Sequence, residues 1–257
     1  MQKVRFMIHK FYLLFFALVV FSIIPIQAQI IEINKDGEAT SLYTPQQLIE
    51  DVLISGACAN VSNFDSQTNG AAASDNREKS YGFFKKPPGS SFPFDQGIIL
   101  TSGRAYDGGN TVDPNDLSYT SLNWGGDSDL ANALNIVDPL TNATYIEFDF
   151  VPNSTEISFR YLMASEEYLG TFPCDFSDSF AFLLKKQGDP TYQNLAVLPD
   201  GITPVSVVNV HFEITDVCGA ENEQYFAGYN MGDTNYNGRT TVLTAQATVV
   251  PNEMYHI

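Results

Sequence analysis

The chain has 257 residues, of which 44% are hydrophobic and 13% aromatic, a composition typical of a globular protein rather than a disordered one. Its 30 Asp and Glu residues outnumber 13 Lys and Arg residues, so the formal net charge is −17. Such a charge repels nucleic acids and anionic lipid surfaces, which excludes nucleic acids as binding partners.

Residues 1–28 have the pattern of an export signal. Lys3, Arg5 and Lys10 form a basic start, an apolar run of 14 residues follows, and Ala28 offers a small residue at a cleavage point. The run is shorter than the ~20 residues of a membrane-spanning helix, so we expect cleavage, with an uncleaved anchor as the alternative. Cleavage would remove three cations and no acids. The product would carry no transmembrane anchor, would have a net charge of −20, and would be secreted or held at the cell surface.

One helix is predicted near the start of the exported chain. We interpret residues 29–43 as a leader. Thr44 and Gln47 form a capping box around Pro45, and apolar residues at helical spacing continue to Leu53. We expect this segment to be the only sizeable helix.

Loops and strands make up the rest of the chain. Residues 70–89 and 107–126 are polar and rich in small residues, and both are expected to be long loops. Apolar alternation predicts strands at 97–101, 144–151, 154–162, 179–186, 193–198, 204–211 and 239–250. The pattern predicts an all-β domain over 44–257, a β-sandwich with jelly-roll-like topology, one short N-terminal helix and long acidic loops. The final residues look like the start of a further strand.

The segment 144–185 combines an aromatic β-core with acidic loops. Each of its three strands repeats apolar side chains with period two, which places them on one face. The carboxylates Glu166, Glu167, Asp175 and Asp178 lie between the second and third strands. An aromatic core beside a gathered set of acids indicates a cation-dependent binding module more than a catalytic pocket.

Several sequence blocks occur in the order found in a known family. They are ACANVSN and GGDSDL, then FDFVP, FRYLMASEEY and FSDSFAFLL, then YNGRTTVLTAQATVVP. Over residues 44–257 the chain resembles the choice-of-anchor L domain of bacterial surface proteins. The resemblance implies a secreted β-domain that precedes other modules and varied anchors, including type IX sorting domains. Because members of the family continue through further strands, the resemblance also implies that the domain is truncated at its C-terminus. It implies a location better than an activity.

Four carboxylates are predicted to form a calcium site. Asp127 and Asp129 are a D-x-D pair after two glycines, Glu166 follows a strand, and Asp178 precedes the next strand. Extracellular Ca²⁺ takes six to eight oxygen ligands, which such groups can supply. Two alternatives stay open, namely that Asp127 caps a helix and that all four are solvated loop charges.

The three cysteines allow at most one internal disulfide. Cys174 and Cys218 both lie in predicted loops, so we favour this pair, and Cys58 is expected to be left over. Three free thiols are the alternative. No C-x-x-C occurs, so neither a zinc site nor a redox motif is indicated.

The sequence offers little support for catalysis. His211 and His256 have no obvious Ser or Cys partner, and we interpret both as structural. Glu166 and Asp178 are the candidate pair for a glycosidase. Trp124, the only tryptophan, is either a core residue or a stacking platform for a sugar ring.

These observations predict a non-enzymatic exported surface domain with an adhesive or ligand-binding role, stabilised by Ca²⁺. Its ligand is expected to be an extracellular glycan or protein. A carbohydrate-binding module of a larger secreted protein is the alternative function, and an extracellular glycosidase is the third.

Overall fold

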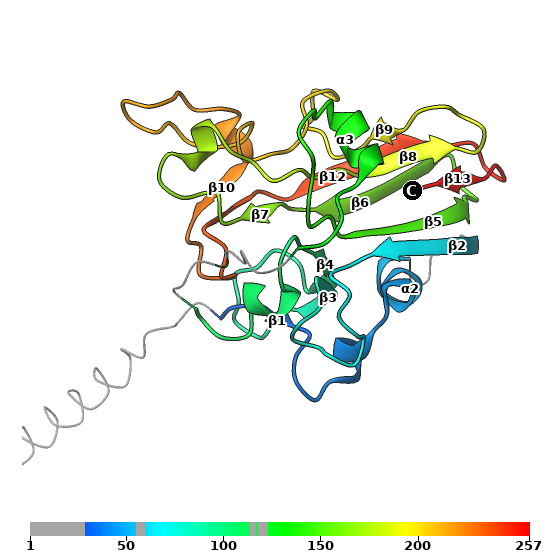
Figure 1. The fold of residues 1–257 in the computed structure, drawn as a ribbon, viewed down its shortest axis with the longest axis horizontal. Helices are drawn as coiled ribbons and strands as arrows, with labels where there is room; N and C mark the ends of the chain where they lie inside the picture. Colours follow the sequence, from blue (N-terminus) through cyan, green and yellow to red (C-terminus); the bar gives the residue numbers. More distant parts are fainter. Residues whose placement is uncertain (1–28, 55–59, 114–116, 118–122) are drawn as a thin grey trace, which may run out of the picture.

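A computed structural model describes residues 29–54, 60–113, 117 and 123–257 of the chain, so the predicted signal and Cys58 lie outside the described residues. Over this portion, 13 strands form four antiparallel sheets with few helices (Figure 1). The largest sheet has the order β2-β5-β13-β8-β9. Its strands are β2 Asn60–Gln67, β5 Tyr145–Val151, β13 Tyr255–His256, β8 Leu183–Lys186 and β9 Gln193–Asn194.

A two-stranded sheet packs against this five-stranded sheet. Strands β6 Glu156–Tyr161 and β12 Leu243–Thr248 pair along their full lengths. Leu243 on β12 and Tyr161 on β6 share one core with Phe148 and Phe150 of β5. Burying each such side chain contributes about 1.5–3 kcal/mol, and the ring centroids of Phe148 and Phe150 are 6.2 Å apart. The all-β sandwich predicted from the sequence is confirmed.

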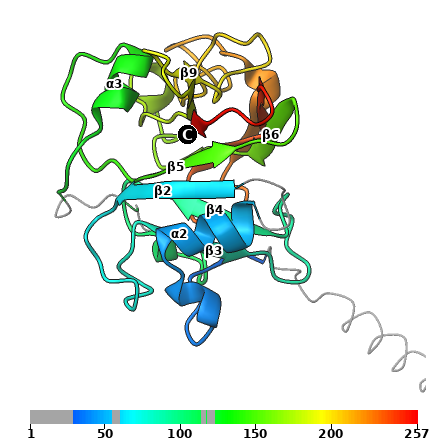
Figure 2. The same ribbon diagram turned by 90° about the vertical axis from the view of Figure 1, so that its right-hand side faces the viewer.

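The N-terminal part of the described chain forms a smaller layer. Strands β1 Glu32–Ile33, β3 Tyr81–Lys85 and β4 Gln96–Leu100 make a three-stranded sheet. Ile31, Ile33 and Phe84 lie in its own buried cluster. Figure 2 shows this sheet and helix α2 (Pro45–Gln47) on one side of β2, and helix α3 (Ser128–Leu134) on the other side.

The predicted helix forms, with a change of geometry along its length. Thr44 and Gln47 make the predicted capping box at α2 Pro45–Gln47, and a wider π-helical turn, Leu48–Leu53, continues it. Shorter 3₁₀ turns occur at Ala39–Leu42, Ala105–Gly108, Phe172–Cys174 and Glu223–Tyr225. Leu48 and Ile49 are buried, so packing and not helix propensity holds this segment.

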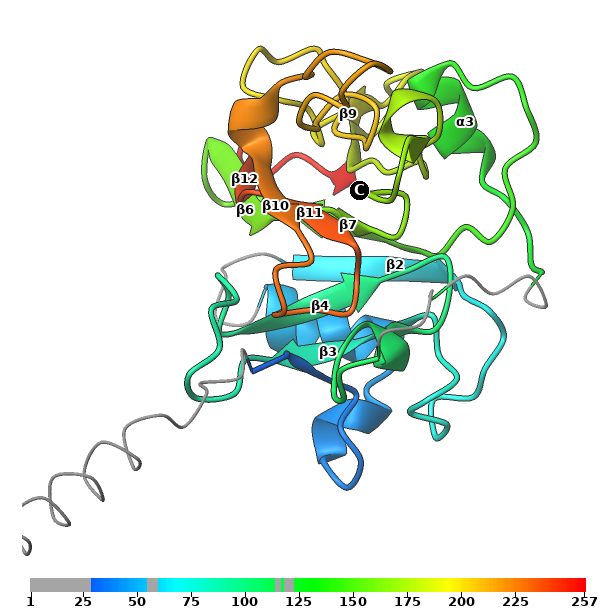
Figure 3. The same ribbon diagram turned by 90° about the vertical axis from the view of Figure 1, so that its left-hand side faces the viewer.

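The fourth sheet, β10-β11-β7, extends the sandwich at one end (Figure 3). Its strands are β7 Ala164–Ser165, β10 Phe226–Tyr229 and β11 Gly238–Thr240. Gly238 lies against the buried Tyr168, where a Cβ atom on residue 238 would stand 2.6 Å from the Tyr168 Cβ. Only glycine permits this approach.

Four sequence predictions need correction. Residues 70–89 are not a continuous loop, because strand β3 lies within them. The first helix is not the only one, because a second helix, α3 Ser128–Leu134, follows the predicted loop 107–126. Residues 204–211 do not form a strand, because Pro204 has no N–H to donate and a turn joins Val207 to Val210. The predicted long strand at 239–250 is divided into β11 and β12.

Candidate functional site

A connected row of polar side chains crosses the solvent-facing side of the five-stranded sheet. Phe148 and Phe150 of β5 point into the core, so the alternating residues Glu147 and Asp149 point to the opposite face. On β13, His256 stands opposite both Asp149 of β5 and Lys185 of β8 in the strand register. We call the following set the polar row: Asn63, Glu147, Asp149, Lys185, Tyr192 and His256.

His256 links the two carboxylates of β5. Its Nδ1 lies 2.8 Å from Asp149 Oδ1, and its Nε2 lies 3.6 Å from Glu147 Oε2. The His256 side chain is 23% exposed, so the contacts are partly shielded from water. Because the imidazole stands between the two carboxylates, they do not face each other across an open cleft.

A backbone irregularity brings Asn63 to the same network. Asn63 has a φ of 51°, and the β2–β5 register shifts between Ser62 and Asp65. Its Nδ2 donates a hydrogen bond of 2.7 Å to Asp149 Oδ2. Burial opposes ionisation of Asp149, but hydrogen bonds from Asn63 and His256 outweigh it and lower the pKa of Asp149.

Glu147 shows the opposite electrostatic behaviour. Burial raises the pKa of Glu147, His256 opposes this shift, and the negative charges of Asp127, Asp65 and Asp129 add to it. Two carboxylates on one strand face thus have pKa values displaced in opposite directions. The row holds Asp149 as a carboxylate and makes Glu147 the easier of the two to protonate.

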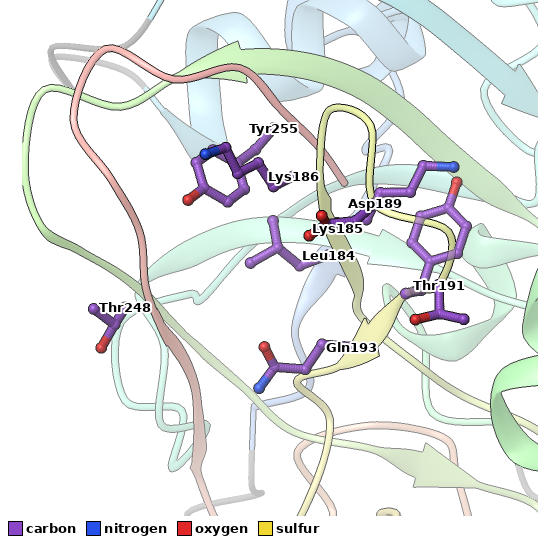
Figure 4. A pocket seen from close by; sticks show the side chains of 9 residues that line it. Leu184, Lys185, Lys186, Asp189, Thr191, Gln193, Thr248 and Tyr255 are labelled. Atoms are coloured by element: carbon purple, nitrogen blue, oxygen red, sulfur yellow. The ribbon is translucent and has the colours of Figure 1, made fainter.

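An aromatic ring and a hollow border the polar row at β8 and β9. Lys185 Nζ lies 4.1 Å from the centroid of the Tyr192 ring, and a hydrogen bond to Tyr192 raises the pKa of Lys185. The Tyr192 and His256 ring centroids are 6.0 Å apart. A hollow of about 360 Å³ continues past Tyr192 and is also lined by Asp189 and Gln193. Figure 4 shows Lys185 and Lys186 pointing away from each other on this hairpin.

None of the polar-row residues was predicted from the sequence to form a binding site. The spacing of Glu147 and Asp149 two residues apart on a predicted strand could have shown that they share a face. The partners of His256 could not be predicted from the sequence, because β13 pairs with β5 and β8, whose residues lie far from His256 along the chain.

Two of the predicted calcium ligands belong to α3. Asp127 is the N-cap of this helix, and its Oδ1 accepts a hydrogen bond of 2.5 Å from the Leu130 N–H. The capping alternative considered for Asp127 is therefore observed. Asp129 lies in the first turn, and both aspartates act electrostatically on Glu147 of the polar row.

The other two predicted ligands lie near the β10-β11-β7 sheet. Glu166 Oε2 accepts a hydrogen bond of 3.1 Å from Asn237 Nδ2, and Glu167 Oε2 accepts one of 2.6 Å from the Asp178 N–H. Glu166 and Asp178 both act electrostatically on Tyr236. Burial raises the pKa of Asp178, although its side chain keeps contact with solvent, which limits the shift.

Asp127 and Asp129 thus both act on Glu147, whereas Glu166 and Asp178 both act on Tyr236. Within the described residues, no three acidic, histidine or cysteine side chains are grouped so that they could hold a metal ion. Calcium binding stays a prediction.

Trp124 and the cysteines have defined places. Trp124 is half-buried, and its Nε1 donates a hydrogen bond of 2.8 Å to the Ala143 carbonyl, so the loop holds one edge of the ring. Cys174 and Cys218, the pair that the sequence favours, form a disulfide with their Cα atoms 5.9 Å apart.

The sequence model described as the choice-of-anchor L domain matches residues 34–257. No curated protein and no solved structure matches the chain. In the portion of the chain that the structure describes, none of the helices has the length and apolarity required to traverse a bilayer.

Proposed function

Because the chain belongs to the choice-of-anchor L domain family, which suggests a secreted surface domain, we propose that it binds an extracellular ligand through the polar row. The observation that carries this proposal is the hydrogen-bonded arrangement of the exposed Asn63 with the half-buried Asp149 and His256 on a solvent-facing sheet. A fixed set of donors and acceptors can recognise a polar ligand with little loss of side-chain entropy on binding.

The arrangement favours binding over hydrolysis. A glycosidase needs two carboxyl groups on either side of the scissile bond, with space between them for the sugar. His256 occupies the space between Glu147 and Asp149. The polar row therefore supports a binding role for this face.

A glycan is the ligand class that the row supports best. Tyr192 supplies an aromatic ring for stacking, and Asn63, Asp149 and Lys185 supply the hydrogen-bonding groups that sugar hydroxyls require. The neighbouring hollow is open and lined by polar groups such as Thr191. An adhesive role at the cell surface follows if that glycan belongs to a host, a substratum or a neighbouring cell.

The test is retention of the exported protein on an array of immobilised polysaccharides. We expect Tyr192→Ala and Asp149→Asn to abolish retention on the glycan that the wild type binds. Gln246→Ala, on the exposed face of β12, is the matched control and should bind normally. Equal retention of Tyr192→Ala and wild type would reject the polar row as the binding site, and retention on no polysaccharide would reject the glycan as the ligand.

A further inference from the structure

A second surface lies away from the polar row, around the disulfide. Of the 14 large hydrophobic side chains exposed in the described part of the chain, six gather on the two loops that the disulfide joins and on the adjacent strand β10. Phe176 is 58% exposed and Val217 53% exposed. We call this set the stapled surface: Leu169, Phe172, Phe176, Phe212, Val217 and Tyr229.

The stapled surface rests on a fixed base. The Cys174–Cys218 bond joins the turn Phe172–Cys174 to the turn closed by the hydrogen bond between the Cys218 N–H and the Ile214 carbonyl. Beneath it the buried Phe226 ring lies 5.0 Å from Phe212 and 4.8 Å from Tyr229, measured between centroids. Exposed side chains on such a base can bind without a large ordering cost.

The charge around the stapled surface has a single sign. The two segments that build it, 166–178 and 211–233, contain nine Asp and Glu residues and no Lys or Arg. Six of the acids are exposed, namely Asp175, Asp178, Glu213, Asp216, Glu221 and Glu223. An apolar centre with a polar rim is the usual anatomy of a protein interface. A rim that is uniformly acidic selects for a partner of positive charge.

We propose that the stapled surface docks a cationic, apolar segment of another protein, with apolar side chains on Phe172 and Phe176 and Lys or Arg side chains on the acidic rim. A second copy of this chain does not fit, because the two acidic rims would face each other. Sugars do not fit well either, since Phe, Leu and Val side chains offer sugar hydroxyls no hydrogen bonds. The acidic rim also repels anionic lipid.

The test uses three synthetic peptides of equal length that alternate Lys with Leu, Lys with Ser, and Glu with Leu. Binding of each to the full-length exported protein is measured by calorimetry at low and high salt. We expect the Lys–Leu peptide alone to bind, and its affinity to fall as salt rises because the rim attraction is screened. Phe176→Ser should weaken that binding about tenfold, as removal of a central aromatic anchor does.

Matched variants separate this site from general attraction to an acidic protein. Val137→Ser removes an apolar side chain that is 96% exposed elsewhere, and Glu156→Lys reverses an exposed charge on β6. Both should bind the Lys–Leu peptide almost as wild type does, whereas Glu213→Lys should bind it several-fold more weakly. Equal weakening by Val137→Ser and Phe176→Ser would overturn the proposal.

Two further results would replace the cationic partner with another occupant. A concentration-dependent dimer in sedimentation, lost in Phe176→Ser, would identify the stapled surface as a contact between copies of the chain. Binding to phosphatidylcholine vesicles that Phe176→Ser abolishes would identify it as a membrane contact. We expect the wild type to sediment as a monomer and to leave such vesicles unbound. Failure of the glycan experiment would not affect these outcomes, because the polar row lies on another sheet.

Discussion

Arg239 and Asp233 form a two-point ion pair in the interior of the protein. Arg239 Nη2 lies 2.7 Å from Asp233 Oδ2, Arg239 Nε lies 3.2 Å from Oδ1, and the Asp233 side chain has no exposed surface. The Asp233 carbonyl accepts a hydrogen bond from the Ile31 N–H, and the Arg239 guanidinium lies over the Phe92 ring. The pair therefore joins the β10-β11-β7 sheet to the layer formed by β1, β3 and β4.

Breaking this pair from one side is expected to destabilise the fold strongly. Asp233→Asn or Arg239→Met leaves the partner charge buried without compensation, at a cost of about 3–5 kcal/mol. The double variant Asp233→Leu/Arg239→Met removes both charges and should recover most of this loss. Urea unfolding of the three variants measures the effect, and single variants within about 1 kcal/mol of wild type would contradict it.

Local sequence patterns predicted those parts of the fold whose contacts are also local. The capping box at Thr44 and the alternation around Phe148 depend on neighbours within a few residues, and both were found as expected. The N-cap role of Asp127 was also open from the sequence. The seven residues of α3 are too few for helical periodicity to predict a second helix there.

The polar row and the ion pair could not be found in this way. His256 meets Asp149 only because β13 inserts between β5 and β8, a pairing that joins residues 107 positions apart. Such pairing depends on the complete sheet order, which short-range periodicity does not encode.

Removal of the Cys174–Cys218 bond is expected to lower the free energy of unfolding. Closing a loop across a sequence separation of 44 contributes up to about 4 kcal/mol in the chain-entropy model. The double variant Cys174→Ser/Cys218→Ser should lose about 2–4 kcal/mol in urea unfolding without reductant. The same variant measured with reductant should match reduced wild type. Peptide mapping that links Cys58 to either cysteine would contradict this pairing.

Calcium is expected to raise the melting temperature if one pair of acidic residues gains further oxygen ligands. At about ten times a dissociation constant of ~10⁻⁴ to 10⁻³ M, linkage gives about 1.4 kcal/mol, or roughly 3–6 °C for a domain of this size. Asp178→Asn and Asp127→Asn test the two pairs separately, and asparagine at 127 can still cap α3. Identical melting curves in EDTA and in millimolar calcium would reject calcium stabilisation.

Lys79 is expected to give the protein an unusual gain in stability at alkaline pH. Its side chain is fully buried, its Nζ donates to the Ser41 carbonyl at 2.7 Å and lies 4.9 Å from the centroid of the Tyr81 ring, and burial lowers the pKa of Lys79 to about 8. Below pH 8 the amine is charged in both states, so folding bears the full cost of burying the charge. Between pH 8 and the unfolded value near 10.5, the unfolded chain holds more protons, and stability rises with pH.

The size of this gain follows from the difference between the two pKa values. At 1.36 kcal/mol per unit it is about 3 kcal/mol, an upper value because the carbonyl acceptors favour the charged amine. Lys79→Met is the matched control, since methionine keeps the volume and does not titrate. Urea unfolding of both proteins from pH 7 to 10.5 should show wild type gaining stability relative to Lys79→Met, while the tyrosines titrate alike in both. A constant difference between the two proteins across this range would show that Lys79 keeps an ordinary pKa in the folded state.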